Sequence, residues 1–261
     1  MTADLVFYGF NSATTTLDRS IRTIGVGYGE KIKGTVTWGV ILHPQGVVVV
    51  DTGMNKRIID ARDTTWGTNR LGIPEMRAGQ EVEARLRSID LQPSDVRYVI
   101  NTHLHGDHVG GNLDLPTATF ICQKDEYEYA HDPDIPSMIR EYPTHEIAGD
   151  RLEYKLIEGE LDLFGDGTIR MFRTPGHTPG HQSLLVQLKE TGPVIMTGDA
   201  LAAKELLDDM TLPGICWWFS EYVKSRRQLR ALQQELGARW FYTHDADTFG
   251  ALGWEEGGAY R

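Results

Sequence analysis

The stretch NTHLHGDHVGGN concentrates side chains that bind metal ions. It holds His103, His105, Asp107 and His108 within six residues, in a chain that has nine histidines in total. A neutral imidazole binds a borderline cation such as Zn²⁺ through one ring nitrogen, and a carboxylate adds charge that retains the dication. In an extended segment His103 and His105 point to the same side, and the glycine-containing turn redirects the next two side chains toward a second position. One loop can therefore serve two metal ions.

Further residues of the same types occur later in the chain. His177 and His181 lie in TPGHTPGHQ, Asp199 lies in MTGDA, and His244 lies in YTHD. Each comes just after an apolar run and in or beside a turn. The alternative interpretation of the first cluster, a polar turn with solvated histidines, does not account for these additional ligands. The pattern therefore favours a metal site assembled from several loops.

Short apolar runs separated by turn signals predict the strands that position these loops. LVFYGF, TWGVILH and GVVVVDTG are predicted strands; HPQG indicates a hairpin between the second and third, and the valines of the third indicate burial on both faces. VRYVI leads directly into the histidine cluster. ATFICQ, the segments on both sides of TPGH, PVIMTGDA and ARWFYTHDAD are predicted to form the remaining strands.

Three segments have the pattern of helices. Residues 78–91 place Val82, Leu86 and Ile89 at helical spacing, and KDEYEYAH is a shorter candidate. The clearest helix is SEYVKSRRQLRALQQELG, for which we predict Ser220 as N-cap and Gly237 as the stop. Its predicted inward stripe is Val223, Leu229, Leu232 and Leu236. Two irregular connections, residues 55–76 with short helical pieces and residues 131–150, complete the prediction, and loops of such length are usually functional.

Composition limits the classes of protein that fit. The 261 residues are 40% hydrophobic and 24% charged, as in ordinary globular proteins, and without repeats or linkers they favour one domain over residues 1–261. The net charge of −11 argues against nucleic acid as a partner. Without a signal-peptide pattern or a membrane-length apolar run, we expect a cytoplasmic protein with no membrane partner. Cys122 and Cys216 are too few for a disulfide framework and are predicted to be buried thiols.

The motifs HLHGDH, TPGH, TGDA and YTHD, in this order and preceded by DTG at residues 51–53, resemble those of the metallo-β-lactamase superfamily. They spread over nearly the whole chain. THLHGDHVGG, TPGHTPGHQSLLV and the late THD are most similar to the N-acyl-homoserine lactonase group. The resemblance implies an α/β fold, the four-layer αβ/βα sandwich, with a dinuclear site at one edge.

The resemblance also implies a ligand set and a mechanism. The first metal would be held by His103, His105 and His177, the second by Asp107, His108 and His244, with Asp199 bridging them. A hydroxide between the two metals would attack the substrate carbonyl, and Asp107 would pass a proton to the leaving alkoxide. The cofactors would be two divalent metal ions. Imidazole and carboxylate ligands favour zinc and also admit iron, manganese or cobalt.

Other residues are candidates for supporting roles. Asp51, at the end of VVVVD, is predicted to orient a ligand histidine or the metal loop, with a simple strand-end turn as the alternative. His181 is predicted to hydrogen-bond to the ligands or to line the pocket. Ala202 stands where many lactonases of this group have a tyrosine, three residues after the bridging aspartate. An oxyanion donor must then come from elsewhere, or from the metal alone.

Aromatic residues downstream of Ala202 are candidates for a pocket wall. Trp217, Trp218 and Tyr222 are named for this role, together with Phe219. The alternative is that CWWF belongs to the core or to a contact with a second copy of the chain. A homodimer is therefore one of the expectations.

The sequence therefore predicts a metal-dependent hydrolase that opens the ring of a small lactone, an N-acyl-homoserine lactone or a similar one, with a role in quorum quenching. A thioesterase of the glyoxalase II type, or a hydrolase of another ester or amide, would use the same ligands. A catalytically inactive metal-binding sensor or scaffold is the alternative that is not an enzyme. An exported β-lactamase is disfavoured because several of these carry cysteine at the bridging position and an export signal, and a nuclease is disfavoured by the acidic charge.

Overall fold

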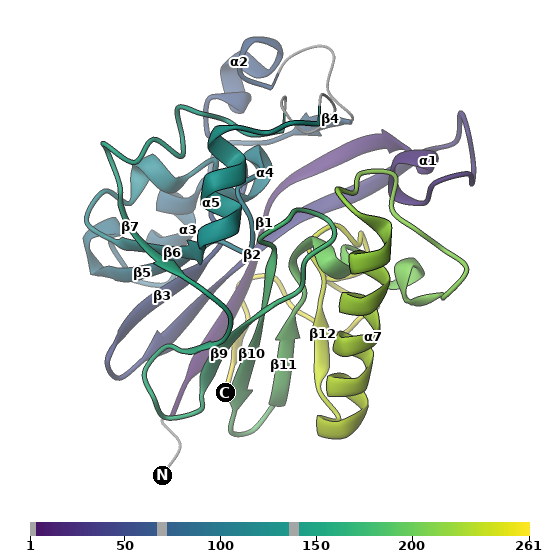
Figure 1. Cartoon of the computed structure of the whole chain (residues 1–261). Coiled ribbons are helices and arrows are strands. Elements are labelled where there is room, and N and C mark those ends of the chain that lie inside the picture. The colour runs from purple at the N-terminus through teal and green to yellow at the C-terminus, as the bar shows by residue number, and fades with distance from the viewer. Residues whose placement is uncertain (1–3, 67–71, 136–140) are drawn as a thin grey trace.

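A computed structural model describes residues 4–66, 72–135 and 141–261, and within them the strands form two sheets. The larger sheet has the order β13-β1-β2-β3-β5-β6-β7, with β4 paired to β1, and the second has the order β12-β11-β10-β9-β8 (Figure 1). The larger sheet comprises β1 (Val6–Asp18), β2 (Lys31–His43), β3 (Gly46–Val50), β4 (Ile73–Glu75), β5 (Val96–Ile100), β6 (Thr119–Gln123), β7 (Glu153–Ile157) and β13 (Ala259–Tyr260). The second comprises β8 (Leu161–Asp162), β9 (Ile169–Arg173), β10 (Gln182–Leu188), β11 (Gly192–Met196) and β12 (Arg239–Phe241).

Helices connect these strands and cover the outer faces of the sheets. The α-helices are α1 (Arg19–Arg22), α2 (Ile58–Thr65), α3 (Val82–Arg87), α4 (Gly106–Val109), α5 (Lys124–His131) and α7 (Phe219–Leu236). Four short 3₁₀ helices are described: η1 (Pro93–Asp95), η2 (Asn112–Asp114), η3 (Gly198–Leu201) and η4 (Lys204–Leu207). Within the described ranges, no helix combines the length and the apolar character needed to cross a membrane.

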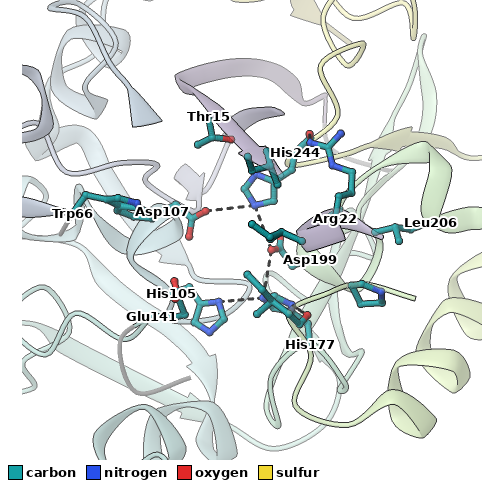
Figure 2. A pocket seen from close by; sticks show the side chains of 15 residues that line it. Thr15, Arg22, Trp66, His105, Asp107, Glu141, His177, Asp199, Leu206 and His244 are labelled. Atoms are coloured by element: carbon teal, nitrogen blue, oxygen red, sulfur yellow. Dashed lines mark hydrogen bonds and ion pairs between the residues drawn. The ribbon is translucent and has the colours of Figure 1, made fainter. Parts of the chain in front are cut away.

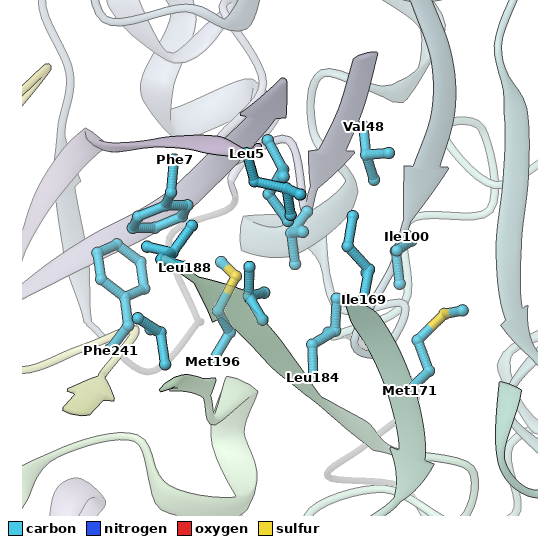
Figure 3. Packing of buried hydrophobic residues seen from close by; sticks show 14 of the residues in the cluster. Leu5, Phe7, Val48, Ile100, Ile169, Met171, Leu184, Leu188, Met196 and Phe241 are labelled. Carbon is cyan, nitrogen blue, oxygen red and sulfur yellow. The ribbon is translucent and has the colours of Figure 1, made fainter. Parts of the chain in front are cut away.

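The main core lies between the two sheets. Alternate residues of each strand point toward the opposite sheet, so that Ile41 and Val48 of the larger sheet belong to the same buried cluster as Leu184 and Met196 of the second. Figure 3 shows side chains from both sheets meeting in this layer. The continuous valines of β3 are buried on both faces as predicted, because Val49 points the other way, into a second cluster.

The two outer faces are closed by helices. Val82 and Leu86 of α3 pack with Trp38 and Phe120 on the larger sheet. On the second sheet, Leu229 of α7 packs in a separate cluster with residues of β10 and β11. The order of layers is therefore helix, sheet, sheet, helix, which confirms the predicted αβ/βα sandwich.

Several predicted elements have other bounds in the structure. β1 and β2 are longer than LVFYGF and TWGVILH because they pair from Val6 with Leu42 as far as Asp18 with Lys31. The helix predicted over residues 78–91 is only the six residues of α3. The chain leaves the helical conformation at Asp90, whose φ is +60°. Of the irregular connections, the first contains α2 and also β4, while residues 67–71 and 136–140 lie outside the described residues.

The long helix α7 begins earlier than predicted, and its N-cap is Trp218, so the prediction of Ser220 was wrong. The start is set by tertiary contacts, because the backbone N–H of Trp218 donates to the carbonyl of Gly176. Gly237 ends the helix in the left-handed conformation, with φ +62°, as predicted. Of the predicted stripe, Leu229 is buried, Leu232 and Leu236 pack beside it, and Val223 is only half-buried.

The two cysteines differ in environment. Cys122, in β6, is buried as predicted. Cys216 is only half-buried, and its thiol donates a hydrogen bond to the carbonyl of Gly176 at 3.0 Å. The prediction of a buried thiol was therefore wrong for Cys216, which lies in the turn leading into α7.

Candidate metal centre

The predicted ligand residues meet where strands of both sheets end. β3 is parallel to β5, and β11 is parallel to β12, so each pair brings its carboxyl ends to one edge. His103 lies just beyond β5, Asp199 lies in η3 beyond β11, and His244 lies beyond β12. The turn between β9 and β10 contributes His177. The centre is therefore built from both halves of the sandwich.

One group of metal-binding atoms is formed by His103, His105 and His177, whose ligand atoms lie within 4.8 Å of one another. The Nδ1 atom of His105 is 3.1 Å from Nε2 of His177 (Figure 2). His177 uses its other nitrogen, Nδ1, at 3.2 Å from the carbonyl of Ile215. A carbonyl only accepts, so Nδ1 carries the proton and Nε2 presents its lone pair to the centre.

A second group is formed by Asp107, His108 and His244, all within the same limit. His244 Nε2 lies 3.5 Å from Asp107 Oδ2, and its Nδ1 lies 2.7 Å from the carbonyl of Thr35. His108 Nε2 makes no hydrogen bond to a described residue and lies 3.4 Å from Asp199 Oδ1. Both imidazoles therefore direct Nε2 into the centre.

Asp199 lies between the two groups. Its Oδ2 atom is 3.4 Å from His177 Nε2 and 3.3 Å from His244 Nε2, and Oδ1 faces His108. The hydroxyl of Thr243 donates to Oδ1 at 2.7 Å and holds the carboxylate in this orientation. One carboxylate thus contacts members of both groups.

His181 is buried beside the centre but belongs to none of these groups. Its Nε2 atom accepts a hydrogen bond from the backbone N–H of Asp199 at 2.9 Å, so its proton is on Nδ1, 2.9 Å from the Thr174 hydroxyl. Both ring nitrogens are therefore occupied by protein atoms. His181 supports Asp199 and has no lone pair left for a metal.

Asp51 is buried at the end of β3 in a left-handed conformation, with φ +57°. Its Oδ1 accepts the backbone N–H of Thr102 at 2.8 Å, and its Oδ2 lies 2.8 Å from both the Thr102 hydroxyl and His108 Nδ1. The Thr102 oxygen is in turn 3.1 Å from His103 Nδ1. One aspartate therefore orients, directly or through Thr102, two histidines of the centre.

The electrostatics of the centre suit a cation. Burial, reinforced by the neighbouring His108, holds the pKa of His103 well below its ordinary value, so that ring is neutral. Burial also works against charge on His108 and on Asp199. At His108 the negative charges of Asp199, Asp51 and Asp107 outweigh burial and raise the pKa well above its ordinary value. At Asp199 the neighbouring His244, followed by His108 and His177, outweighs burial and holds the pKa well below its usual range. The raised pKa of His108 reflects an excess of negative charge, which a metal ion would balance in place of the proton. Imidazole nitrogens beside ionised carboxylates are the donors that bind metals, so the residues present fit a pair of divalent ions.

Glu126 is a supporting residue that the sequence analysis missed. Its side chain is fully buried, and its Oε1 accepts the backbone N–H of Leu104 at 2.9 Å while Oε2 accepts that of Gly180 at 3.2 Å. Leu104 lies between His103 and His105, and Gly180 lies in the turn that holds His177. Burial raises the pKa of Glu126, opposed by these hydrogen bonds. The available signal was a carboxylate on the inward face of the predicted helix over KDEYEYAH.

A pocket opens over the centre and is lined by both polar and apolar side chains (Figure 2). Its lining comprises Thr15, Leu17, Ile21, Arg22, Trp66, His105, Asp107, Glu141, His177, Asp199, Ala202, Leu206, Pro213, Ile215 and His244. Ala202 lies in the pocket as predicted. The sequence analysis did not identify Arg22, Trp66 or Glu141, because no motif marks them.

The predicted aromatic wall from CWWF is wrong, since Trp217, Trp218 and Tyr222 do not line this pocket. Trp218 is 54% exposed, Tyr222 is a fully buried residue of α7, and Trp217 packs beside Tyr129. Their backbone has a different function. The N–H of Trp217 lies within hydrogen-bond distance of the carbonyls of Gly176 and His177, so this segment braces the His177 turn.

Comparison with known proteins agrees with this geometry. Residues 32–244 match the family model of the metallo-beta-lactamase superfamily. The N-acyl homoserine lactonase AttM of Azorhizobium caulinodans is 33% identical over 85% of this chain and 86% of its own, and an N-acyl homoserine lactonase of a Bacillus species is 36% identical over 72% and 73%. A solved N-acyl homoserine lactone hydrolase, with N-hexanoyl-L-homoserine at its catalytic metal centre, superposes with a TM-score of 0.84 at 28% identity over 95% of both chains. The chain belongs to the metallo-β-lactamase superfamily.

Proposed function

We propose that this protein is a metal-dependent hydrolase that opens the ring of N-acyl-homoserine lactones. The observation that carries the proposal is the set of overlapping His and Asp groups at the base of a pocket, joined by Asp199. Relatives that share most of their length with this chain are named as lactonases for this substrate class. We also infer that the whole chain acts as one domain.

The ligand assignment follows the groups. One cation would be held by His103, His105 and His177 and the other by Asp107, His108 and His244, and Asp199, which lies between the two groups, would be available to both. Zinc is the proposed metal, because imidazole nitrogens dominate the ligand set. Two such cations would lower the pKa of water at the site toward neutrality and polarise the carbonyl of a lactone.

The side chains of the protein supply orientation and proton transfer. Asp107 is half-buried and belongs both to a ligand group and to the pocket lining. Its carboxylate can take up the proton that the attacking water loses and pass it to the alkoxide oxygen that leaves when the ring opens. Asp51, His181 and Glu126 hold the ligand loops, so little reorganisation is required during the reaction. The apolar part of the lining, including Leu206 and Ile215, suits the hydrocarbon part of an acyl chain.

The function is tested by metal analysis and a substrate panel. The purified protein is expected to contain two metal ions per chain and to release protons from N-hexanoyl-homoserine lactone faster than from a glutathione thioester or a penicillin. Faster turnover of the thioester would favour the glyoxalase II type of activity instead. A protein that lacks transition metal, and that added zinc, iron, manganese or cobalt does not activate, would contradict the proposal.

The role of Asp107 is tested by Asp107→Asn. Asparagine has nearly the same size and shape as aspartate, but its amide group cannot transfer the proton. We expect kcat for the lactone to fall about 10²- to 10⁴-fold, the usual contribution of general acid–base catalysis. Asp150→Asn, at an exposed aspartate remote from the ligand groups, is the matched control and should retain wild-type kcat. Unchanged turnover in Asp107→Asn, with metal content intact, would show that another group donates the proton.

A further inference from the structure

Arg22, the last residue of α1, places a guanidinium in the wall of the pocket. The residue is part of the pocket lining, and only 10% of its side chain is exposed. Figure 2 shows it beside His244 and near Leu206, whereas Trp66 and Asp107 lie on the other side of the view. The mechanism proposed above does not use this cation.

The guanidinium is held in a fixed position. Its Nη2 donates to the carbonyl of His244 at 2.6 Å, and its Nε lies 3.6 Å from Glu205 Oε1. The facing position on β2 is Gly34, where a Cβ would come within 2.6 Å of Nη2 and 3.0 Å of the His244 carbonyl. Any larger residue at Gly34 would therefore displace the guanidinium from the pocket wall.

Part of this guanidinium remains available to a ligand. Arginine has five N–H donors, and Nη1 of Arg22 forms no hydrogen bond with any residue in the described ranges. The pocket wall also includes Leu206, Pro213 and Ala202, which have no side-chain acceptor, and Figure 2 shows Leu206 near Arg22. A donor in such surroundings binds an acceptor oxygen strongly, because little water competes for it.

The charge around Arg22 indicates which acceptor fits. Glu205 already pairs with the guanidinium, and Asp107, Asp199 and Glu141 line the same pocket. An anionic group on the substrate would meet these carboxylates, whereas a neutral carbonyl oxygen would not be repelled. An N-acyl-homoserine lactone has two neutral carbonyl oxygens outside the ring. The lactone carbonyl would be turned toward the metal ions, which leaves the oxygen of the acyl amide for Arg22.

We propose that Arg22 donates a hydrogen bond from Nη1 to the acyl carbonyl oxygen of the substrate, and so selects lactones that carry an amide side chain. This inference rests on the proposed lactonase function. It makes Arg22 a specificity-determining residue, which contacts the substrate away from the bond that breaks.

The test combines a change in the protein with a change in the substrate. Wild type and Arg22→Met are compared on N-hexanoyl-homoserine lactone and on γ-decalactone, which has a lactone ring and an alkyl chain but no amide. We expect Arg22→Met to lower kcat/KM for the acyl-homoserine lactone about 10- to 100-fold, mainly through KM, as the loss of a hydrogen bond to a charged donor predicts. For γ-decalactone the fall should be at least about tenfold smaller, because there is no amide oxygen to lose.

Arg19→Met is the matched control, because Arg19 lies in the same helix and pairs with Glu30 and Glu205 but does not line the pocket. It should leave the ratio of the two kcat/KM values at the wild-type level. If Arg22→Met lowers both substrates equally, Arg22 acts only by supporting His244, and the proposal is overturned. If Arg22→Met does not fold, as judged by thermal unfolding, Arg22→Leu, which also lacks a hydrogen-bond donor, replaces it, and the same change in the ratio is required.

The two proposals fail in different ways. Wild type that opens neither lactone contradicts the lactonase function. Wild type that opens the acyl-homoserine lactone, with a substrate ratio that Arg22→Met or Arg22→Leu does not change, contradicts only the role of Arg22.

Discussion

At the scale of single residues, three imidazoles of the centre are held in position through Nδ1, the ring nitrogen that does not face the centre. His108 is held by Asp51, His177 by the carbonyl of Ile215, and His244 by the carbonyl of Thr35. Each contact selects the tautomer that presents Nε2 to the centre and prevents rotation of the ring. The ligand geometry is thus a property of the folded chain and does not have to be imposed by the metal.

Tyr222 can be used to test whether the aromatic residues near the start of α7 lie outside the pocket, as the structure shows. Its hydroxyl is buried and has no hydrogen-bond partner in the part of the chain that the structure describes. Because an unsatisfied buried hydroxyl costs free energy, Tyr222→Phe should raise the free energy of unfolding by about 1 kcal/mol. Denaturant unfolding measures this change, and kcat/KM for the lactone should stay at the wild-type value. A loss of activity at an unchanged free energy of unfolding would show that the Tyr222 hydroxyl takes part in substrate binding or catalysis.

At the scale of elements, the centre depends on contacts between loops that are distant in sequence. Glu126 lies in the first turn of α5, after β6, yet its carboxylate joins the loop after β5 to the turn between β9 and β10. The fit is close, because a Cβ on Gly180 would come within 2.1 Å of the Glu126 backbone nitrogen. Glycine is therefore required at this point of the TPGHTPGH motif for packing, in addition to its use in the turn.

Glu126→Gln should loosen this connection. Glutamine has the same size, but its side-chain NH₂ group cannot accept the hydrogen bond that one carboxylate oxygen accepts, so one of the two loops loses its partner. We expect metal affinity to fall about 10- to 100-fold, as for other residues that orient ligands. Competition with a chromogenic chelator measures the affinity. Glu128→Gln, at an exposed position of the same helix, is the control, and equal affinities in the two variants would exclude this role for Glu126.

At the scale of the whole molecule, the centre joins the two halves of the sandwich. His103, His105, Asp107 and His108 come from the larger sheet, while Asp199 and His244 follow strands of the second. Ions bound to both sets would link the sheets at the edge that the main core does not reach. Metal binding should therefore increase the stability of the folded state, because a ligand that binds only the folded state stabilises it.

Removal of metal should consequently lower the thermal stability. Treatment with a chelator is expected to reduce Tm by several degrees, since a change of about 1 kcal/mol shifts Tm by about 2–4 °C in a chain of this size. Differential scanning calorimetry before and after chelation measures the shift, and added zinc should restore both Tm and lactone hydrolysis. A Tm that does not respond to chelation, in protein shown by analysis to have lost its metal, would contradict the coupling.

The sequence by itself determined which residues are candidate metal ligands, because their chemistry is expressed in local spacing, and the structure brings these residues together in groups that could hold metal ions. HLHGDH, TPGH, TGDA and YTHD are each a few residues long, and the apolar runs before them predict the strands whose ends they occupy. The order of layers followed from the same motifs through their resemblance to a known family. The expectations of a homodimer and of a cytoplasmic location stay predictions.

Only the tertiary structure decided what surrounds those ligands. Arg22, Glu126 and Glu141 belong to none of the ligand motifs, and each reaches the site through contacts with segments far away in the chain. The same cause explains the errors, since Ser220 is displaced as a cap, and CWWF is turned away from the pocket, by contacts of Trp217 and Trp218 with the His177 turn. Spacing along the backbone specifies which atoms can bind a metal, whereas packing between distant segments specifies which substrate can reach it.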